Sequence, residues 1–217
     1  MRPFTEITAV AAILLRNNVD TDAIIPSREI TSVSKTGLAP GLFAGWRYRD
    51  RERRILDPSF ELNDPAYRGA EVLLAGENFG CGSSREYAVW ALAEYGFRVV
   101  IAASFNPIFF RNCVRNGVVP AQLGLPGIRR IARWVAQDPH AHRLTIDLAA
   151  TTIAAADGLA QRFTIAEDAR DTLLQGLDAI DRTLKLAGEI AAFRDADRGR
   201  RPWVYESNEL RESDHCK

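Results

Sequence analysis

Two serines and an arginine follow a glycine-rich turn near the middle of the chain. Residues 80–86 are Gly-Cys-Gly-Ser-Ser-Arg-Glu, and the two glycines permit backbone conformations that let a ligand approach closely. If Ser83 and Ser84 begin a helix, its free N–H groups and positive dipole end favour an anion. The Arg85 guanidinium matches a carboxylate or phosphate with two hydrogen bonds. The turn therefore predicts an anion site with two hydroxyls and one guanidinium.

A purely structural interpretation of the same turn is also open. One of the serines could cap the helix while Glu86 complements the helix dipole from the first turn. The stretch lacks the lysine that a P-loop places after its second glycine. It also lacks the glycine that follows the serine by two residues in a nucleophile elbow. The residues alone therefore leave a helix cap and an anion site as alternatives.

A second polar turn lies near the start of the chain. Residues 17–22 are Asn-Asn-Val-Asp-Thr-Asp, a cluster of turn-forming residues. Two aspartates that flank Thr21 could serve the turn itself, or they could bind a cation. A full set of calcium ligands does not follow them.

The elements around the serine turn predict where it lies in the fold. An apolar run over residues 70–75 precedes it, and an apolar run over residues 98–102 follows later. Between them, apolar residues recur with the spacing of a buried helical stripe, and Gly96 is a typical helix stop; the stripe is Ala88, Ala91, Leu92 and Tyr95. This strand–helix–strand order predicts an α/β fold with a parallel crossover and the serine turn at its ligand-binding end.

Periodicity and turn residues predict the remaining elements. Long, weakly anchored loops often act as lids or specificity loops, and residues 27–40 form such a stretch, a mobile loop or a short irregular helix. The charged stretch 47–54 mixes both signs, which favours a solvated loop or a partner-facing surface over an RNA-binding patch. A capping box at residues 164–167 predicts a helix that ends near Gly176. The other expected elements are a first strand (7–15), a helix (106–116), a strand (118–123), a helix (129–136), a hairpin (143–148 with 151–155) and a core-facing helix (from 177 to about 191).

Composition limits the class of protein. The chain has 217 residues, 47% of them hydrophobic, with 28 basic and 28 acidic side chains. This balance argues against a general nucleic-acid or membrane surface. The apolar segment 9–15 lacks a cleavage pattern, and no run approaches the length of a membrane helix. We therefore expect a soluble, cytoplasmic protein, with a domain over residues 1–194 and a charged tail with a docking segment over residues 195–217.

The three cysteines do not form a recognisable framework. Cys81, Cys113 and Cys216 are widely spaced, which suits a reducing compartment and lacks the close spacing usual in zinc or iron–sulfur sites. His140 and His142 have no nearby cluster of ligands. We expect no metal bound by this chain alone.

Two separated motifs give the chain a family resemblance. Residues 18–26, Asn-Val-Asp-Thr-Asp-Ala-Ile-Ile-Pro, and residues 77–86, Glu-Asn-Phe-Gly-Cys-Gly-Ser-Ser-Arg-Glu, resemble the 3-isopropylmalate dehydratase small subunits of the aconitase superfamily. The similarity runs in order from about residue 7 to residue 205. Supporting stretches are residues 45–48, 95–102, 104–105, 108–109 and 162–165.

The resemblance implies a fold, a partner and a reaction. The fold would be the swivelling β/β/α domain of aconitase-type enzymes, here with a C-terminal helical segment. The partner would be a large subunit that carries a 4Fe-4S cluster, and the substrate a small dicarboxylate. Members of this family isomerise 2-isopropylmalate to 3-isopropylmalate in leucine biosynthesis by dehydration and rehydration, a hydro-lyase activity that requires both subunits.

The resemblance also assigns roles to residues. Ser83 would be the catalytic base in its deprotonated form, stabilised by the helix start and Arg85. Substrate binding would involve Ser84 and Arg85, with Arg28 as a second contact for a carboxylate. The matching turn residues Asp22 and Thr21 would have supporting roles.

Two departures from the family pattern bear on the substrate. Residues 27–30 are Ser-Arg-Glu-Ile where a basic residue, an aromatic residue and a leucine are common. A polar Glu29 in this loop leaves a related dehydratase for another branched malate, of the citramalate or dimethylmalate type, as an alternative. Tyr-Ala-Val at residues 87–89 replaces the commoner His-Ala-Pro, a change expected to affect packing. A non-catalytic binding or assembly module with the swivel fold is the third hypothesis.

Overall fold

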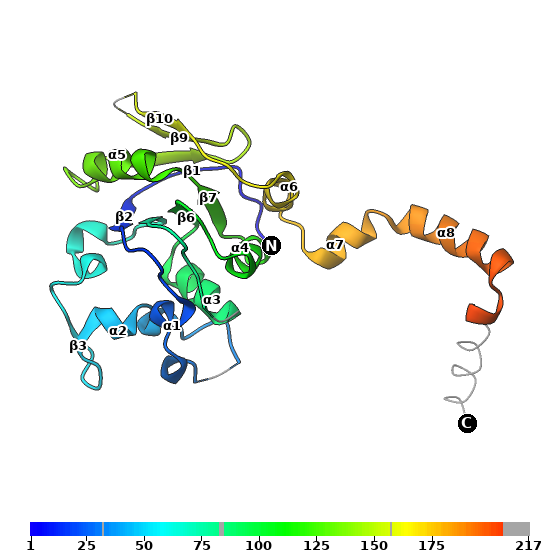
Figure 1. The fold of residues 1–217 in the computed structure, drawn as a ribbon, viewed down its shortest axis with the longest axis horizontal. Coiled ribbons are helices and arrows are strands. Elements are labelled where there is room, and N and C mark those ends of the chain that lie inside the picture. The colour runs from blue at the N-terminus through cyan, green and yellow to red at the C-terminus, as the bar shows by residue number, and fades with distance from the viewer. Residues whose placement is uncertain (32, 83–84, 157, 206–217) are drawn as a thin grey trace. The chain divides into compact units, whose positions relative to one another are not determined.

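The computed structural model describes residues 1–31, 33–82, 85–156 and 158–205 (Figure 1). The chain divides after Gly176 into two units, the first over residues 1–176 and the second from Leu177 onward. Among the described residues, no helix is both long and apolar enough to cross a membrane.

A parallel sheet forms the centre of the first unit. Its strands are ordered β2-β5-β6-β7, and all neighbouring pairs are parallel. Nearly every residue of these strands is buried, as expected for a sheet that is covered on both faces. The strands are β2 (Ala11–Leu14), β5 (Val72–Ala75), β6 (Val99–Ala102) and β7 (Val119–Gln122).

An antiparallel sheet covers one face of the parallel sheet. Val72 and Leu74 of β5 belong to a hydrophobic cluster that also contains Leu144 and Ile153 of the antiparallel sheet. Helices α5 (Leu125–Val135) and α6 (Glu167–Gln175) contribute apolar residues to the same cluster. The antiparallel strands, in the order β1-β8-β9-β10, are β1 (Glu6–Ala9), β8 (Leu144–Asp147), β9 (Thr152–Ala155) and β10 (Ala160–Arg162).

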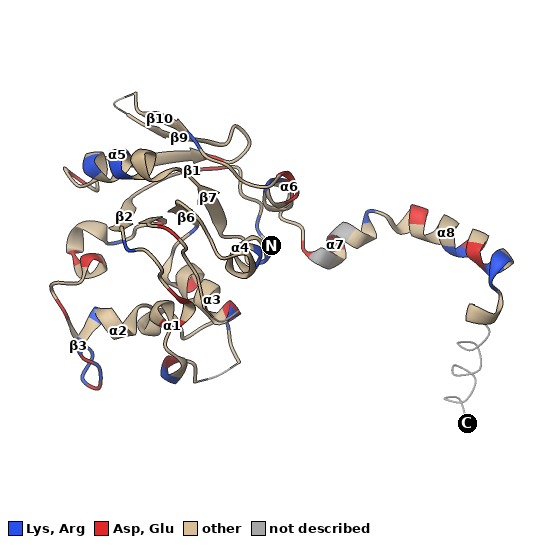
Figure 2. Cartoon of the chain, viewed as in Figure 1, with Lys and Arg blue, Asp and Glu red and all other residues tan. Residues whose placement is uncertain are grey.

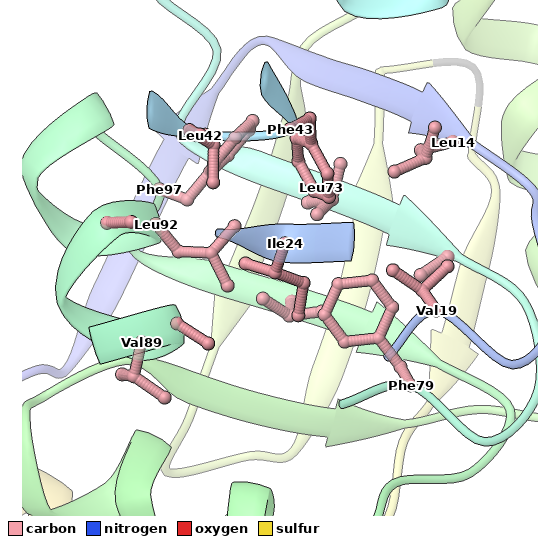
Figure 3. Packing of buried hydrophobic residues seen from close by; sticks show 14 of the residues in the cluster. Leu14, Val19, Ile24, Leu42, Phe43, Leu73, Phe79, Val89, Leu92 and Phe97 are labelled. Carbon is pink, nitrogen blue, oxygen red and sulfur yellow. The ribbon is translucent and has the colours of Figure 1, made fainter. Parts of the chain in front are cut away.

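Helices cover the other face of the parallel sheet. Leu73 of β5 points opposite to its neighbours Val72 and Leu74, because side chains alternate along a strand, and it packs with Leu92 of α3 (Figure 3). The three layers therefore form the expected β/β/α arrangement. The helices whose residues line this second cluster are α1 (Thr21–Ile24), α3 (Glu86–Tyr95) and α4 (Pro107–Arg115).

Short elements lie between β2 and β5. Besides α1, the described residues there form one short helix, four 3-10 turns and a two-stranded ribbon, and Figure 2 shows charges of both signs around β3. Their bounds are η1 (Ser27–Glu29), η2 (Ala39–Gly41), α2 (Ala44–Arg47), β3 (Tyr48–Asp50), β4 (Ile55–Leu56), η3 (Glu61–Asn63) and η4 (Pro65–Tyr67).

Most predicted elements are confirmed, including the parallel β5–α3–β6 crossover, α4, β7, α5 and the β8–β9 hairpin. The prediction of one first strand over residues 7–15 is wrong. The apolar run divides at Val10 into β1 and β2, which join different sheets. Local periodicity cannot show such a change of sheet, because the run continues through Val10 without a turn-forming residue.

The prediction for the start of α6 is also wrong. The expected capping box does not form: α6 begins at Glu167 with Ala166 as N-cap, while Thr164 pairs through its backbone with Gln122. The helix does end at Gly176, as predicted.

The described part of the second unit, up to residue 205, contains the helices α7 (Ala179–Leu184) and α8 (Ala187–Arg200). The predicted core-facing stripe is absent from the described part of this unit, because Ile180 is 70% exposed and Leu184 is 63% exposed. The division of the sequence into residues 1–194 and 195–217 stays a prediction.

Candidate functional site

The two polar turns of the sequence lie side by side at the carboxyl edge of the parallel sheet. One follows β2 and the other follows β5, and these strands are neighbours. Carboxyl ends of parallel strands are where α/β proteins bind ligands. Among the described residues, backbone hydrogen bonds join the turns from Asn18 N to Glu77 O (2.8 Å), from Gly80 N to Val19 O (2.7 Å) and from Thr21 N to Cys81 O (3.0 Å).

Asparagine side chains strengthen this junction, a role that the sequence analysis missed. Asn18 and Asn78 both have a φ of 54°, a left-handed conformation that asparagine tolerates better than most residues. Asn78 Nδ2 donates to Asn18 Oδ1 at 2.9 Å, and the Glu77 N–H donates to Asn17 Oδ1 at the same distance. The signal available in sequence was the presence of asparagine in both turns.

Gly80 lets the second turn lie against α4. Its φ of +74° favours glycine, and a Cβ at this position would lie 2.0 Å from Cγ of the Phe109 ring. Phe109 in turn packs edge-on against buried Phe79, with ring centroids 5.5 Å apart. A side chain at residue 80 would therefore displace the core beneath the turn.

Arg85 and Asp22 connect the two turns through an ion pair. Arg85 Nη1 donates to Asp22 Oδ1 at 2.5 Å, and Ser27 N donates to the same oxygen at 3.3 Å. The Arg85 hydrogen bond is the main reason why the pKa of the Asp22 carboxyl lies below its ordinary value. Burial acts in the opposite direction and is outweighed, because the bond from Ser27 and the charges of Arg85 and Arg28 also lower the pKa. Two residues predicted to serve one site are thus in direct contact.

Ser83 and Ser84 lie outside the described residues. The structure places their neighbours: Gly82 lies beside the Asp20 side chain, and Arg85 is the N-cap of α3, which begins at Glu86. The prediction that the serines themselves begin the helix lies outside the described residues. Their chemical roles stay predictions.

Thr21 and Asp20 belong to the short helix α1. The Thr21 side chain is buried, and its Oγ1 lies 4.0 Å from where a Cβ of Gly82 would be. Asp20 is the N-cap and accepts a hydrogen bond from Ala23 N at 2.6 Å. The structural interpretation of these turn residues is confirmed for Asp20, and Thr21 lies beside Gly82, the residue before the serines.

Arg28 and Glu29 follow the first turn in η1. Arg28 Nε is 3.6 Å from Glu29 Oε1, and the Arg28 side chain is half exposed. The Glu29 side chain is only 9% exposed and accepts a 2.6 Å hydrogen bond from Arg54 Nη2. Glu29 is thus bound to an arginine of the same chain, although the sequence analysis placed it against the substrate.

The loop over residues 27–40 is attached to α3 at its far end. The Glu94 carboxylate accepts three successive backbone N–H groups, from Gly37 (2.6 Å), Leu38 (2.5 Å) and Ala39 (2.8 Å). Burial raises the pKa of Glu94, but these three bonds outweigh it, and the pKa lies below its ordinary value. The prediction of a weakly anchored loop missed this attachment.

Asn116 connects the same loop to the two helices of the site. Its Oδ1 accepts hydrogen bonds from Lys35 Nζ (3.2 Å) and Trp90 Nε1 (3.0 Å). Its Nδ2 donates to Glu86 Oε1 at 2.8 Å, at the first residue of α3. The sequence carried no signal for this role beyond a polar residue at the end of a helix.

The described residues contain no group of three or more histidine, cysteine or acidic side chains that could hold a metal ion. Cys81 and Cys113 are both unpaired, and burial raises the pKa of the Cys113 thiol well above its ordinary value. His142 stacks on Trp134 with centroids 4.2 Å apart, a packing role. The described part of this chain therefore does not fit an iron–sulfur cluster. Cys216 lies outside it.

The chain is similar to known proteins over the residues that form this site. The model of the Aconitase C-terminal domain family matches residues 1–125. The 3-isopropylmalate dehydratase small subunit of Cupriavidus necator is 53% identical over 205 residues, which cover 94% of this chain and 99% of that protein. The protein of the same name from Neisseria meningitidis serogroup A is 46% identical over 212 residues, with the same coverage. The crystal structure of 3-isopropylmalate dehydratase from Methanocaldococcus jannaschii has a TM-score of 0.61 at 27% identity, covering 87% of this chain and 99% of that one.

Proposed function

The chain belongs to the Aconitase C-terminal domain family and, within it, to the 3-isopropylmalate dehydratase small subunits, and we propose that it is the small subunit of this hydro-lyase. With a large subunit, it isomerises 2-isopropylmalate to 3-isopropylmalate in leucine biosynthesis. The observation that carries this proposal is the junction of the two turns by the Arg85–Asp22 ion pair, because it assembles one anion site from two distant motifs. The cytoplasm is the proposed compartment, in line with widely spaced cysteines.

Ser83 is the proposed base. Removal of a proton from carbon beside a carboxylate requires a positioned base, and an unassisted serine hydroxyl is too weak an acid to supply one. The first-turn N–H groups of α3 and the Arg85 guanidinium stabilise the serine anion electrostatically. Ser84 donates a hydrogen bond to the substrate.

Arg85 and Arg28 are the proposed contacts for the two substrate carboxylates. A guanidinium has five N–H donors, and the Asp22 contact engages Nη1 of Arg85. Asp22 supports the site by orienting that guanidinium. Thr21, which is buried, supports the first turn, over residues 17–22. The charges of both arginines lower the pKa of the same carboxyl group, that of Asp22.

The 4Fe-4S cluster belongs to the proposed large subunit, which supplies a Lewis acid for the departing hydroxyl. This chain contributes the base and the carboxylate contacts, and therefore half of an active site.

The substrate of the proposed reaction is 2-isopropylmalate. The alternative, a dehydratase for another branched malate, was based on a polar Glu29 facing the substrate. The Glu29 side chain is 9% exposed and paired with Arg54, which supports a structural role for it and removes that reason for the alternative. The Glu29–Arg54 pair therefore gives no support to a citramalate-type substrate.

Reconstitution of the two-chain enzyme tests the proposal. We expect turnover of 2-isopropylmalate, and a Ser83→Ala variant should lose at least about 100-fold in kcat, since a general base contributes 10²–10⁴-fold. Ser59→Ala, in an exposed turn where the hydroxyl bonds to Asp57, is the matched control.

Three outcomes would contradict the proposal in different ways. Good activity with citramalate or dimethylmalate alone would move the substrate to the alternative. Binding of the large subunit without turnover of any of these diacids would favour the non-catalytic module. Full activity of Ser83→Ala, with assembly verified by gel filtration, would remove the serine from its role as base.

A further inference from the structure

One arginine outside both motifs connects the two ends of the loop over residues 27–40. Arg54 Nη2 donates to Glu29 Oε2 at 2.6 Å, at the start of the loop. Arg54 Nη1 donates to the carbonyl of Pro40 at 3.3 Å, at its end. The guanidinium also lies 5.0 Å from the centroid of the Tyr48 ring, and the Tyr48 hydroxyl donates to the same carbonyl at 2.9 Å. The loop is therefore closed at its base by Arg54.

The position of Glu29 is fixed by packing as well as by charge. A Cβ on Gly41 would lie 2.7 Å from Cβ of Glu29, so the backbone of η2 lies directly against this side chain. With 9% of its side chain exposed, the Glu29 carboxylate depends on nearby cations for its stabilisation. Among the described residues, the cations within reach are Arg54 at 2.6 Å and Arg28 at 3.6 Å.

These distances show which arginine neutralises Glu29. The contact with Arg54 is a charge-assisted hydrogen bond, whereas the contact with Arg28 is an ion pair beyond hydrogen-bonding distance. The trio of Arg28, Glu29 and Arg54 carries one net positive charge. Arg28 is half exposed, and its charge acts on both the Glu29 carboxylate, 3.6 Å away, and the Asp22 carboxyl, whose pKa it lowers.

We propose that Arg54 is a positioning residue: by holding the Glu29 carboxylate, it keeps Arg28 available for the second carboxylate of the substrate. This inference rests on the proposed function for the identity of the substrate. Without Arg54, the nearly buried Glu29 carboxylate has Arg28 as its nearest cation. Arg28 then moves from its present 3.6 Å to hydrogen-bonding distance of the Glu29 carboxylate, and away from the substrate.

Three variants of the assembled enzyme test this role. Arg54→Met should raise KM for the diacid substrate about tenfold with a smaller change in kcat, since a hydrogen bond to a charged group is worth at least a factor of about ten. Arg54→Met combined with Glu29→Gln should return KM most of the way to the wild-type value, because a neutral amide does not compete for Arg28. Arg53→Met is the control, since its side chain is 80% exposed and its ion pair is with Asp50.

The double variant separates positioning from simple support of the loop. If Arg54 only held the base of the loop together, removal of Glu29 as well would leave KM as high as in Arg54→Met, or higher, and the proposal would be wrong.

A second readout does not depend on activity. In the isolated chain, NMR titration should show a higher Asp22 pKa in Arg54→Met than in wild type, because Arg28 moves away, and a return toward wild type in the double variant. An enzyme inactive on every diacid would contradict the proposed function, while this titration would still decide the role of Arg54: an unchanged Asp22 pKa in Arg54→Met would overturn it.

Discussion

Asp22 and Arg85 are 63 positions apart in sequence and form one short ion pair. Each alone has an ordinary interpretation, Asp22 as a turn residue and Arg85 as the residue before a helix. The contact gives both a shared role, because it fixes the guanidinium beside the serine turn. The contact also lowers the pKa of the Asp22 carboxyl, a change that can be measured. The pair is partly open to water, with the Asp22 side chain 61% exposed, so its contribution to stability is expected to be below about 1 kcal/mol.

The Asp22 carboxyl provides a pH-dependent test of this contact. Its folded pKa lies below the ordinary value of 3.8, so the ion pair contributes fully above that value and its contribution is lost as the pH falls through the folded pKa. Arg85→Met should raise the folded pKa toward 3.8, as measured by NMR titration of the carboxyl carbon. Arg68→Met, at an exposed position outside both turns, is the control. An identical Asp22 titration in wild type and Arg85→Met would contradict the assigned ion pair.

At the level of elements, α3 joins the serine turn to the loop over residues 27–40. Its first residue, Glu86, is bonded to Asn116, and Glu94 near its last turn binds three loop N–H groups. Arg54 closes the other end of the loop. The loop that carries Arg28 is therefore positioned by the same helix that follows the proposed base. A substitution far from the substrate can affect binding through this attachment.

Glu94→Gln tests the attachment of the loop. An amide has a single acceptor oxygen in place of two, so at least one of the three N–H bonds should be lost. We expect faster hydrogen exchange at Gly37, Leu38 and Ala39, with little change in the strands of the sheet. Glu52→Gln, in the exposed turn before β4, is the control. Unchanged exchange at these three amides would show that the carboxylate does not anchor the loop.

At the level of the whole molecule, both hydrophobic clusters lie within the first unit. Their buried residues end at Leu173, whereas the second unit exposes large apolar side chains, including Phe193 and Trp203 at 64% each. Within the second unit, Asp197 accepts hydrogen bonds from Arg201 and the Tyr205 hydroxyl. These bonds organise the end of α8 locally. The first unit therefore contains the core that stabilises the site.

Removal of residues 178–217 should leave the first unit folded. Because none of its buried core residues is removed, we expect a change of less than about 0.5 kcal/mol in the free energy of unfolding, measured with urea. A longer deletion from residue 167 onward is the contrasting variant. It removes Leu173, which is fully buried and whose carbonyl accepts from Phe4 N, and should destabilise by at least about 2 kcal/mol. A large loss of stability in the shorter deletion would show that the second unit supports the core.

The sequence by itself determined the strand–helix–strand unit around the serine turn, and with it the position of the turn at a ligand-binding edge. These features follow from local patterns: a buried apolar run, a helical stripe and a glycine stop. The family resemblance added the pairing of residues 18–26 with residues 77–86. Neither the residues nor the resemblance showed that β1 and β2 separate at Val10, since no turn-forming residue interrupts the run there.

Only the tertiary structure decided which charged groups meet. Glu29 pairs with Arg54 and Glu94 holds the backbone of residues 37–39, although nothing in their local sequence distinguishes them from solvated carboxylates. Such contacts depend on where distant segments pass one another, which is set by the packing of the layers. Sequence periodicity reports the burial of apolar side chains, whereas the partner of a charge is known only once the chain is folded.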